Sequence, residues 1–199
     1  LMEQLADNGD GFYAYIDDMD EAKRLFVDEL TGTLQTIAMD AKVQVDFNPT
    51  VVMRYRLVGF ENRAIADDEF RDNTVDAGEI GAGHTVTALY EIKLYPEAHG
   101  RIATVLMRWE DPDTHQVVEI SKDYDTSQIS PDFRETDPYF QRAVVVAEFA
   151  EILKGSYWAE ESSMDDVYDE ARRIADYLYR DDVMDEFVDL VREARRLMD

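Results

Sequence analysis

The residues best suited to chemistry lie together in one acidic segment, which ends in a glycine-rich turn and His84. The segment carries seven carboxylates, namely Glu61, Asp67, Asp68, Glu69, Asp72, Asp76 and Glu79. A carboxylate that orients an imidazole can make it a general base, so hydrolase or lyase chemistry on a glycan is one interpretation. Because no nucleophile in a recognisable motif accompanies His84, we favour a structural histidine in a loop.

The glycines before His84 are Gly78, Gly81 and Gly83, which permit positive φ and a close approach of the backbone. A phosphate-binding loop would need a Gly-Lys-Ser/Thr sequence and a following helix, and the pattern after His84 is that of a strand. The glycines therefore predict a tight bend that leads into a sheet. We expect the seven carboxylates and His84 to form an interaction surface, with a solvated loop and a steric turn as the alternative interpretation.

A second acidic turn, at residues 7–11, has some features of a calcium-binding loop. It lacks an oxygen ligand at the first loop position, where Ala6 would stand, and an aromatic strand follows where a helix should begin. The chain has no cysteine, and no metal-binding spacing relates its three histidines, His84, His99 and His115. We therefore expect a turn at residues 7–11 and no metal, cofactor or catalytic residue, with a Ca²⁺-binding module as an alternative.

The charge of the chain narrows the class of partner. Its 199 residues include 45 acidic and 20 basic side chains, which gives a formal net charge of −25. Such a surface repels nucleic acid and anionic lipid headgroups. No apolar run approaches the roughly 20 residues that cross a bilayer. We expect neither a nucleic-acid partner nor membrane insertion, which leaves a protein as the partner to consider.

The spacing of apolar residues, which predicts the helices and strands that must position the acidic segment and His84, changes along the chain. Residues 1–35 predict a helix, a strand and a second helix, with Asp17 and Asp18 as N-cap candidates. Alternation of apolar and polar residues with a period of two then predicts five strands, at residues 43–47, 51–60, 85–95, 101–109 and 116–120. Because hairpins and one long connection join these strands, we expect an antiparallel β-sandwich of the immunoglobulin-like kind.

A helical period returns after Pro138 and predicts a unit of three helices packed on the sandwich. The first helix, residues 139–153, is apolar on more than half of its circumference and should be nearly buried. The second follows the N-cap candidate Ser163, and the third follows Asp181 or Asp182. The side chains expected to pack inward are Val167, Ala171, Ile174, Ala175 and Leu178 in the second helix, and Phe187, Val188, Leu190, Val191, Ala194 and Leu197 in the third.

Residues 11–30 have the sequence GFYAYIDDMDEAKRLFVDEL. This stretch and several others resemble one family, the bacterial von Willebrand factor type A domain-containing proteins. Residues 11–30 are similar to the last strand and last helix of the A domain. The stretches GFENRAIADDEF and DAGEIGAGHTVTALYEI resemble the segment that follows the A domain in this family. The C-terminal helices of the family are resembled by DPYFQRAVVVAEFAEILKGS, EARRIADYL and FVDLVREARRL.

The resemblance implies an α+β chain of three parts: a remnant of the A domain at 1–35, a β-sandwich at 36–135 and a three-helix unit at 136–199. A domains of this family bind a divalent cation through an Asp-x-Ser-x-Ser motif, which this chain lacks. The resemblance therefore places that cation only in an upstream A domain. It also implies a location at the cell envelope. The function we expect is a non-catalytic interaction or spacer module beside a metal-dependent, adhesion-type A domain.

Overall fold

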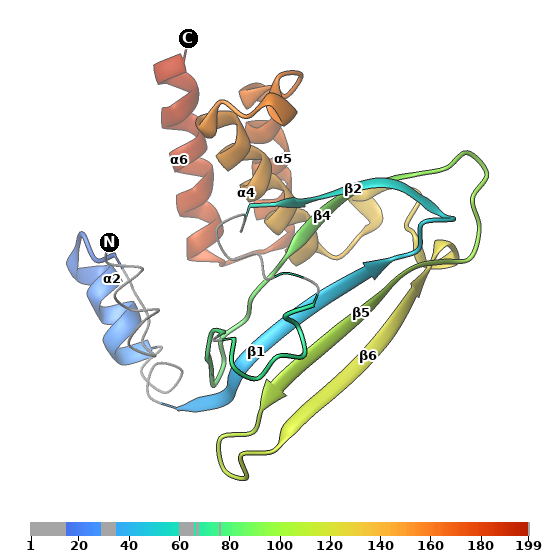
Figure 1. The fold of residues 1–199 in the computed structure, drawn as a ribbon. Coiled ribbons are helices and arrows are strands. Elements are labelled where there is room, and N and C mark those ends of the chain that lie inside the picture. Colours follow the sequence, from blue (N-terminus) through green and yellow to red (C-terminus); the bar gives the residue numbers. More distant parts are fainter. Residues whose placement is uncertain (1–14, 29–34, 60–65, 67, 76, 199) are drawn as a thin grey trace. The chain divides into compact units, whose positions relative to one another are not determined.

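The computed structural model describes residues 15–28, 35–59, 66, 68–75 and 77–198, which form helices and antiparallel sheets (Figure 1). The chain divides into two compact units. The second unit consists of Leu57–Gly59, Thr87–Glu91 and the chain from Ile129 on, and the first unit holds the other described residues. The predicted α+β class with antiparallel strands is confirmed.

Four strands of the first unit form one sheet in the order β3-β1-β5-β6, and each neighbouring pair is antiparallel. Figure 1 shows β1, β5 and β6 side by side along their length. The other two strands, β2 and β4, pair in a separate sheet. The strands are β1 (Thr36–Phe47), β2 (Val52–Val58), β3 (Ile80–Gly81), β4 (Leu89–Leu94), β5 (Arg101–Glu110) and β6 (Val117–Asp125).

The strand predictions are right in their main elements and wrong at some edges. Residues 85–88, which we predicted as the start of a strand, have none, and Val86 is exposed. The short strand β3 was not predicted, because two residues are too few to show an alternation. Strand β6 continues to Asp125, beyond the predicted end at residue 120.

The two faces of the large sheet differ in polarity because side chains alternate along each strand. On one face the aligned residues of β1, β5 and β6 are Lys42, Arg108 and Glu119. One residue further along, on the opposite face, the aligned residues are apolar: Val43, Met107 and Ile120. At this level of the sheet the register therefore places charged side chains on one face and apolar side chains on the other.

The hydrophobic core of the first unit lies where the two sheets meet. It takes residues from β1, β2, β4 and β5 and from the turns that adjoin them, so it links the large sheet to the small one. Its buried members are Val51, Val52, Ile102 and Ala103, with Val45, Phe47, Ile92, Leu94 and Ala98 packed against them. The β-sandwich and its immunoglobulin-like form remain predictions.

The N-terminal part of the chain is described only from Tyr15 to Asp28. Tyr15 and Ile16, the described part of the strand predicted at residues 12–16, have no strand structure. Asp18 caps the following helix, since its carboxylate accepts the N–H of Glu21 at 2.8 Å. The helix begins as α2 (Met19–Lys23) and continues as one π-helical turn (Arg24–Asp28).

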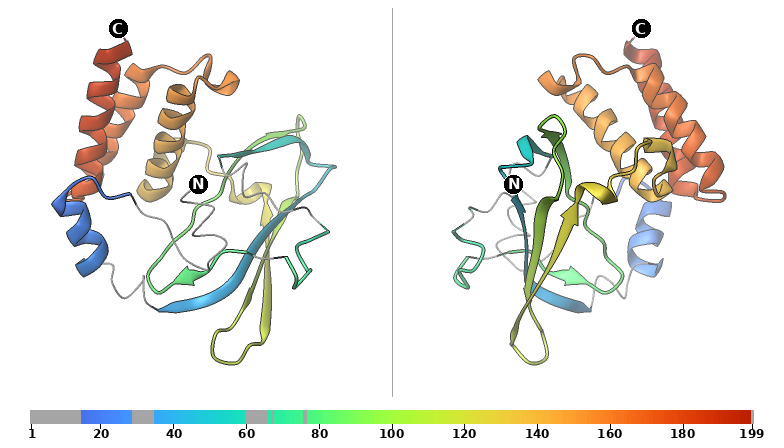
Figure 2. Two further views of the ribbon diagram at one scale, coloured as in Figure 1. Left: turned by 60° about the vertical axis from the view of Figure 1, so that its left-hand side comes forward. Right: turned by 90° about the vertical axis from the view of Figure 1, so that its right-hand side faces the viewer.

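The described part of the second unit contains three α-helices, which lie alongside one another in both views of Figure 2. Asp137 caps α4, and Gly155 ends it in a left-handed conformation with φ of 64°. Ser163 caps α5 as predicted. Asp181, rather than Asp182, provides the acceptor for α6, because its carboxylate accepts the N–H of Met184 at 3.0 Å. The helices are α4 (Pro138–Lys154), α5 (Met164–Tyr177) and α6 (Asp182–Met198).

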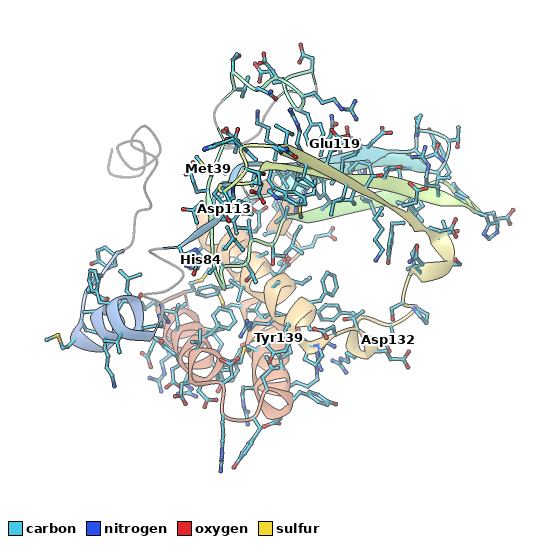
Figure 3. All side chains as sticks on the ribbon, turned by 90° about the horizontal axis from the view of Figure 1, so that it is seen from below. Met39, His84, Asp113, Glu119, Asp132 and Tyr139 are labelled. Carbon is cyan, nitrogen blue, oxygen red and sulfur yellow. The ribbon has the colours of Figure 1, made fainter. Side chains whose placement is uncertain are left out.

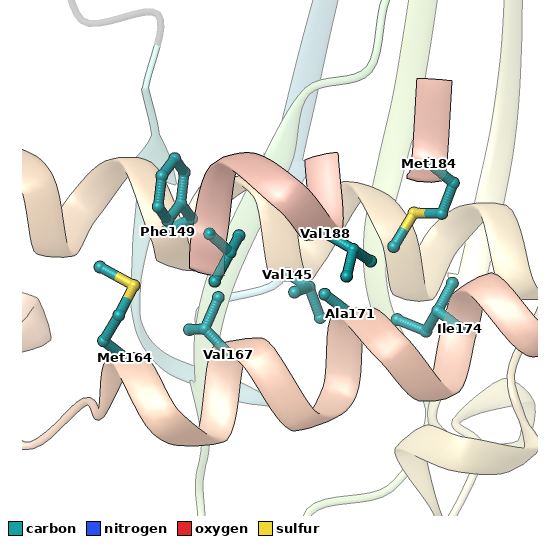
Figure 4. Packing of buried hydrophobic residues seen from close by; sticks show 9 residues of the cluster. Val145, Phe149, Met164, Val167, Ala171, Ile174, Met184 and Val188 are labelled. Carbon is teal, nitrogen blue, oxygen red and sulfur yellow. The ribbon is translucent and has the colours of Figure 1, made fainter. Parts of the chain in front are cut away.

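The core of the helical unit runs between all three helices (Figure 4). Its buried residues are Val145, Phe149, Met164, Val167, Ala171, Ile174, Met184, Val188 and Val191. The predicted inward face of α5 is confirmed, because Ala171 and Ile174 have no exposed surface. In α6, however, Leu190 and Leu197 are exposed, the latter at 88%, because they lie to one side of the stripe formed by Val188 and Val191.

Helix α4 is less buried than its composition predicted. Its buried residues are Gln141, Val145, Phe149 and Glu151, whereas Tyr139 and Leu153 are more than half exposed. A helix that is apolar on more than half of its circumference is expected to be nearly buried, but within this unit α5 and α6 cover only part of α4. None of the described helices is long and apolar enough to traverse a bilayer.

Candidate functional site

Residues 68–75 of the acidic segment are bound to the polar face of the large sheet. The ammonium of Lys42 on β1 donates to the main-chain carbonyl of Asp72 at 2.7 Å. Arg108 on β5 donates to the carbonyl of Phe70 at 3.1 Å and also to the side chain of Asn73. These bonds hold the segment on the sheet, so residues 68–75 are not the freely solvated loop of the alternative interpretation.

A third basic residue fastens the segment to β6. Arg71 donates to both carboxylate oxygens of Glu119, from Nη2 at 2.7 Å and from Nε at 3.2 Å. This two-pronged pairing is the geometry that a guanidinium offers a carboxylate. These hydrogen bonds from Arg71 lower the pKa of the Glu119 carboxyl. The side chain of Phe70, beside Arg71, is buried.

The alignment of Lys42 with Arg108 places two positive charges directly opposite each other. Such a pair destabilises a sheet unless other groups compensate. Lys42 is also 4% exposed, so its charge has little contact with water. The carbonyls of Phe70 and Asp72 and the aligned Glu119 supply the compensation. The acidic segment is therefore part of what makes this polar face stable.

The carboxylate of Asp72 stabilises the turn in which this residue lies. The Asp72 carboxylate accepts the N–H of Thr74 at 2.8 Å and its hydroxyl at 2.7 Å. These two bonds lower the pKa of the Asp72 carboxyl, and the nearby charges of Lys42 and Arg108 lower it further. Asp72 is thus an ionised turn residue whose carboxylate is already engaged.

A small cleft lies between the segment and the sheet. Its lining includes Asp40, Lys42, Asn73, Arg108 and Glu110. Its volume of about 20 Å³ is room for about one water molecule. Asp40 has a positive φ of 49°, and its carboxylate accepts the N–H of Ala77 at 3.2 Å. The charged groups of the cleft hold the backbone of the segment, and the space between them is too small for a glycan.

The structure describes five of the eight predicted surface residues, and it does not bring them to one point. Glu69 accepts the N–H of Ala66 at 3.3 Å, which is a local contact. The ring of His84 makes no hydrogen bond or ion pair with any described residue, and His84 lies well apart from Glu119 in Figure 3. Glu61, Asp67 and Asp76 lie outside the described residues.

The bend before His84 has the predicted form. Gly83 has a φ of 82°, and the N–H of His84 donates to the carbonyl of Gly81 at 3.0 Å. Among the described residues, no group of three or more acidic or histidine side chains could hold a metal ion. The predicted turn at residues 7–11 lies outside them.

Sequence reasoning missed Lys42, Arg71 and Arg108. Each lies in a pattern that reads as ordinary surface charge, because alternation assigns Lys42 and Arg108 to the polar side of their strands. One available signal was the presence of basic residues on strands of a strongly acidic chain that also contains an acidic connection. That signal indicates attraction between them, but it does not give the register that aligns them.

The apolar face of the same sheet is a second feature that the sequence did not reveal. Val43 and Ile120 are 54% and 53% exposed, and Met107 between them is 39% exposed. Val105 and Tyr124 extend this face toward the core, and the exposed Lys122, aligned with Val105, also lies on it. The core that links the small sheet to β1 and β5 is built around Ile102 and Ala103 and does not include Val43, Met107 or Ile120.

Comparison with known proteins identifies relatives of the chain but no solved relative. The family described as "Uncharacterized protein YfbK, C-terminal" matches residues 32–101 and 95–197. The uncharacterized protein YfbK of Escherichia coli (strain K12) is 43% identical over 94 residues, which are 47% of this chain. The matched region covers 16% of that relative's length. No solved structure matches the chain.

Proposed function

Because the chain belongs to the family of the C-terminal region of uncharacterized protein YfbK, we propose that it is a non-catalytic interaction or spacer module of a longer protein. The observation that supports this proposal is the exposed apolar face of β1, β5 and β6. Contiguous exposed apolar surface of this kind is typical of protein interaction sites. Val43, Met107 and Ile120 form its centre, one from each strand.

The polar face of the sheet also supports this proposal, because its contacts with the acidic segment make the sheet rigid. Basic side chains fix the acidic segment to this face. Lys42 and Arg108 bind backbone carbonyls of the segment, and Arg71, within the segment, binds Glu119 of β6. A face so constrained gives the sheet the rigidity that a binding platform needs. In this proposal the polar face fixes the sheet, and the apolar face meets a protein.

The resemblance of the sequence supplies the context of the proposal. We assign the longer protein a von Willebrand factor type A domain that precedes this module and binds the divalent cation. The module then has an immunoglobulin-like sandwich, a helical unit and a place at the cell envelope. Its partner is the A domain itself or a second protein that the A domain recruits.

Photo-crosslinking in the full-length protein tests this proposal. A photoreactive phenylalanine analogue replaces Ile120 in one variant and Val43 in another. Its matched control replaces Ser121, which follows Ile120 on β6, is exposed and points to the opposite face. We expect a defined protein crosslink, within the chain or to a partner, from Ile120 and Val43 and none from Ser121.

The outcome is readable by mass spectrometry of the crosslinked peptides. Absence of crosslinks from both apolar positions under conditions where the protein is folded contradicts the proposal. Equal crosslinking from Ser121 also contradicts it, since the contact would then not depend on the apolar face.

A further inference from the structure

The helical unit carries an unusual concentration of positive charge around one aromatic ring. Three guanidinium groups lie over or beside Tyr168 of α5. That of Arg195 lies 4.6 Å from the ring centroid, that of Arg172 lies 5.8 Å away and that of Arg192 lies 5.9 Å away. Arg192 also donates from Nε to the Tyr168 hydroxyl at 3.3 Å. We call these four residues the tyrosine–arginine cluster.

The positive charge of the cluster is only partly balanced. Arg192 pairs with Asp189 at 2.5 Å, and Arg195 pairs with Asp165 at 3.3 Å. Arg172 is exposed and forms no ion pair with any described carboxylate. Three cations therefore face two carboxylates, in a chain where acidic side chains outnumber basic ones by 45 to 20.

The state of the tyrosine agrees with this excess of positive charge. The hydrogen bond from Arg192 lowers the pKa of the Tyr168 hydroxyl, burial opposes this change, and the charges of Arg192, Arg172 and Arg195 lower it further. A hydroxyl whose ionised form is favoured lies in a locally positive field. The field at this point has the opposite sign to the net charge of the protein.

We propose that the tyrosine–arginine cluster binds carboxylate side chains of an acidic protein segment, and that Arg172 is the guanidinium that receives them. The cluster already binds carboxylates through its other two arginines, and Asp165 and Asp189, which they bind, are themselves exposed. Arg172 is the member that lacks such a partner. A guanidinium binds a carboxylate through two parallel hydrogen bonds, which gives direction as well as affinity.

The ring of Tyr168 contributes by ordering the arginines. A guanidinium over an aromatic face is held by attraction between the cation and the ring, so less conformational entropy is lost when it binds a ligand. The cluster lies along the surface of α5 and α6, which suits an extended segment. This inference rests on the proposed function of protein binding and adds the chemistry of one partner segment.

The net charge of the protein does not prevent such binding at physiological ionic strength. Charges farther away than the Debye length of about 8 Å are largely screened at 0.15 M salt. The groups that act on a bound carboxylate are then those in direct contact, namely the arginines and their two aspartates. Binding is therefore measured at this ionic strength, where the repulsion of distant carboxylates is weak.

Fluorescence anisotropy of a labelled short peptide of alternating glutamate and serine, added to the complete chain, tests the inference. We expect saturable binding by the natural chain and binding about tenfold weaker in Arg172→Gln, since this change removes the charge-assisted contact to the peptide. Arg195→Gln, which removes a neighbouring positive charge that is paired with Asp165, should weaken binding less. The matched control is Arg180→Gln. Arg180 also stacks on a tyrosine, with 5.1 Å from its guanidinium to the ring of Tyr179, but it belongs to no cluster of arginines.

The results that overturn the inference are distinct. It is wrong if the natural chain does not bind the peptide, if Arg180→Gln weakens binding as much as Arg172→Gln, or if a peptide with glutamine for glutamate binds equally well. Circular dichroism of each variant confirms that the fold is retained. Because Ile120 belongs to the other compact unit, crosslinking from Ile120 together with failure of the peptide would reject the cluster and leave the proposed function standing.

Discussion

We expect Ile174→Ala to destabilise the helical unit by about 3–4 kcal/mol. Ile174 lies on α5, has no exposed surface and belongs to the core cluster between the three helices. The substitution removes three buried carbons, and at about 0.8 kcal/mol for each this forfeits about 2.4 kcal/mol of transfer free energy. The cavity left behind adds the remainder, because neighbours held by other contacts close it only in part.

Urea unfolding followed by far-UV circular dichroism measures this change, since α4, α5 and α6 are the longest helices described. A unit of about 70 residues has a total stability of about 4–10 kcal/mol, so the alanine variant is close to unfolding. Ile174→Val removes a single methyl group and provides a graded second variant, for which we expect a loss of about 1 kcal/mol.

Leu197→Ala is the matched control, because it also truncates a large apolar side chain to alanine but at an exposed position. Leu197 lies on α6 and is 88% exposed, so its loss should change the free energy of unfolding by no more than about 0.5 kcal/mol. The reasoning is refuted if Ile174→Ala costs less than about 1 kcal/mol, or if Leu197→Ala costs as much as Ile174→Val. Either result would mean that the helices do not pack around Ile174.

Two further predictions concern charge and backbone conformation in the helical unit. Burial raises the pKa of the Glu170 carboxyl, but hydrogen bonds from Arg173 and Arg134 outweigh burial and leave that pKa lowered. A lowered folded pKa stabilises the fold above the unfolded value of about 4.3, so Glu170→Gln should destabilise the protein at pH 7, and the difference in unfolding free energy should disappear as the pH falls through the folded pKa. Gly155→Ala should cost about 1 kcal/mol in thermal unfolding because its φ of 64° disfavours a Cβ, although no atom lies within 4 Å of that position. Gly78→Ala, with equal space and no such φ, should be neutral or slightly stabilising.

Much of the local structure could be predicted from the residues alone. The inward stripe of α5 and the N-cap Ser163 follow from spacings of three and four and from capping chemistry, which act within one turn of helix. The end of α4 at Gly155 follows from the ability of glycine to adopt a positive φ. These features depend on neighbours in the sequence, so no knowledge of the fold is needed to identify them.

The candidate site could be predicted only in outline. The composition of the segment that contains Asp72 identified it as unusual, and the glycines before His84 indicated a bend. The partners of that segment, Lys42 and Arg108, come from strands far away in the sequence, and pairing between strands brings them together. Alternation gives the side of a strand on which a residue lies, but it does not give the register between strands.

The sequence by itself determined which segments alternate with a period of two, which have a helical period, and where acidic charge accumulates. The periods reflect the short-range sterics of helices and strands, and the acidic charge follows directly from the composition of each segment. Only the tertiary structure decided which face of the large sheet is covered. Two basic side chains aligned across β1 and β5 draw the acidic segment onto the polar face, and so the apolar face with Val43 and Ile120 is left exposed. Covering one face rather than the other depends on contacts between residues far apart in the chain, which a period cannot encode.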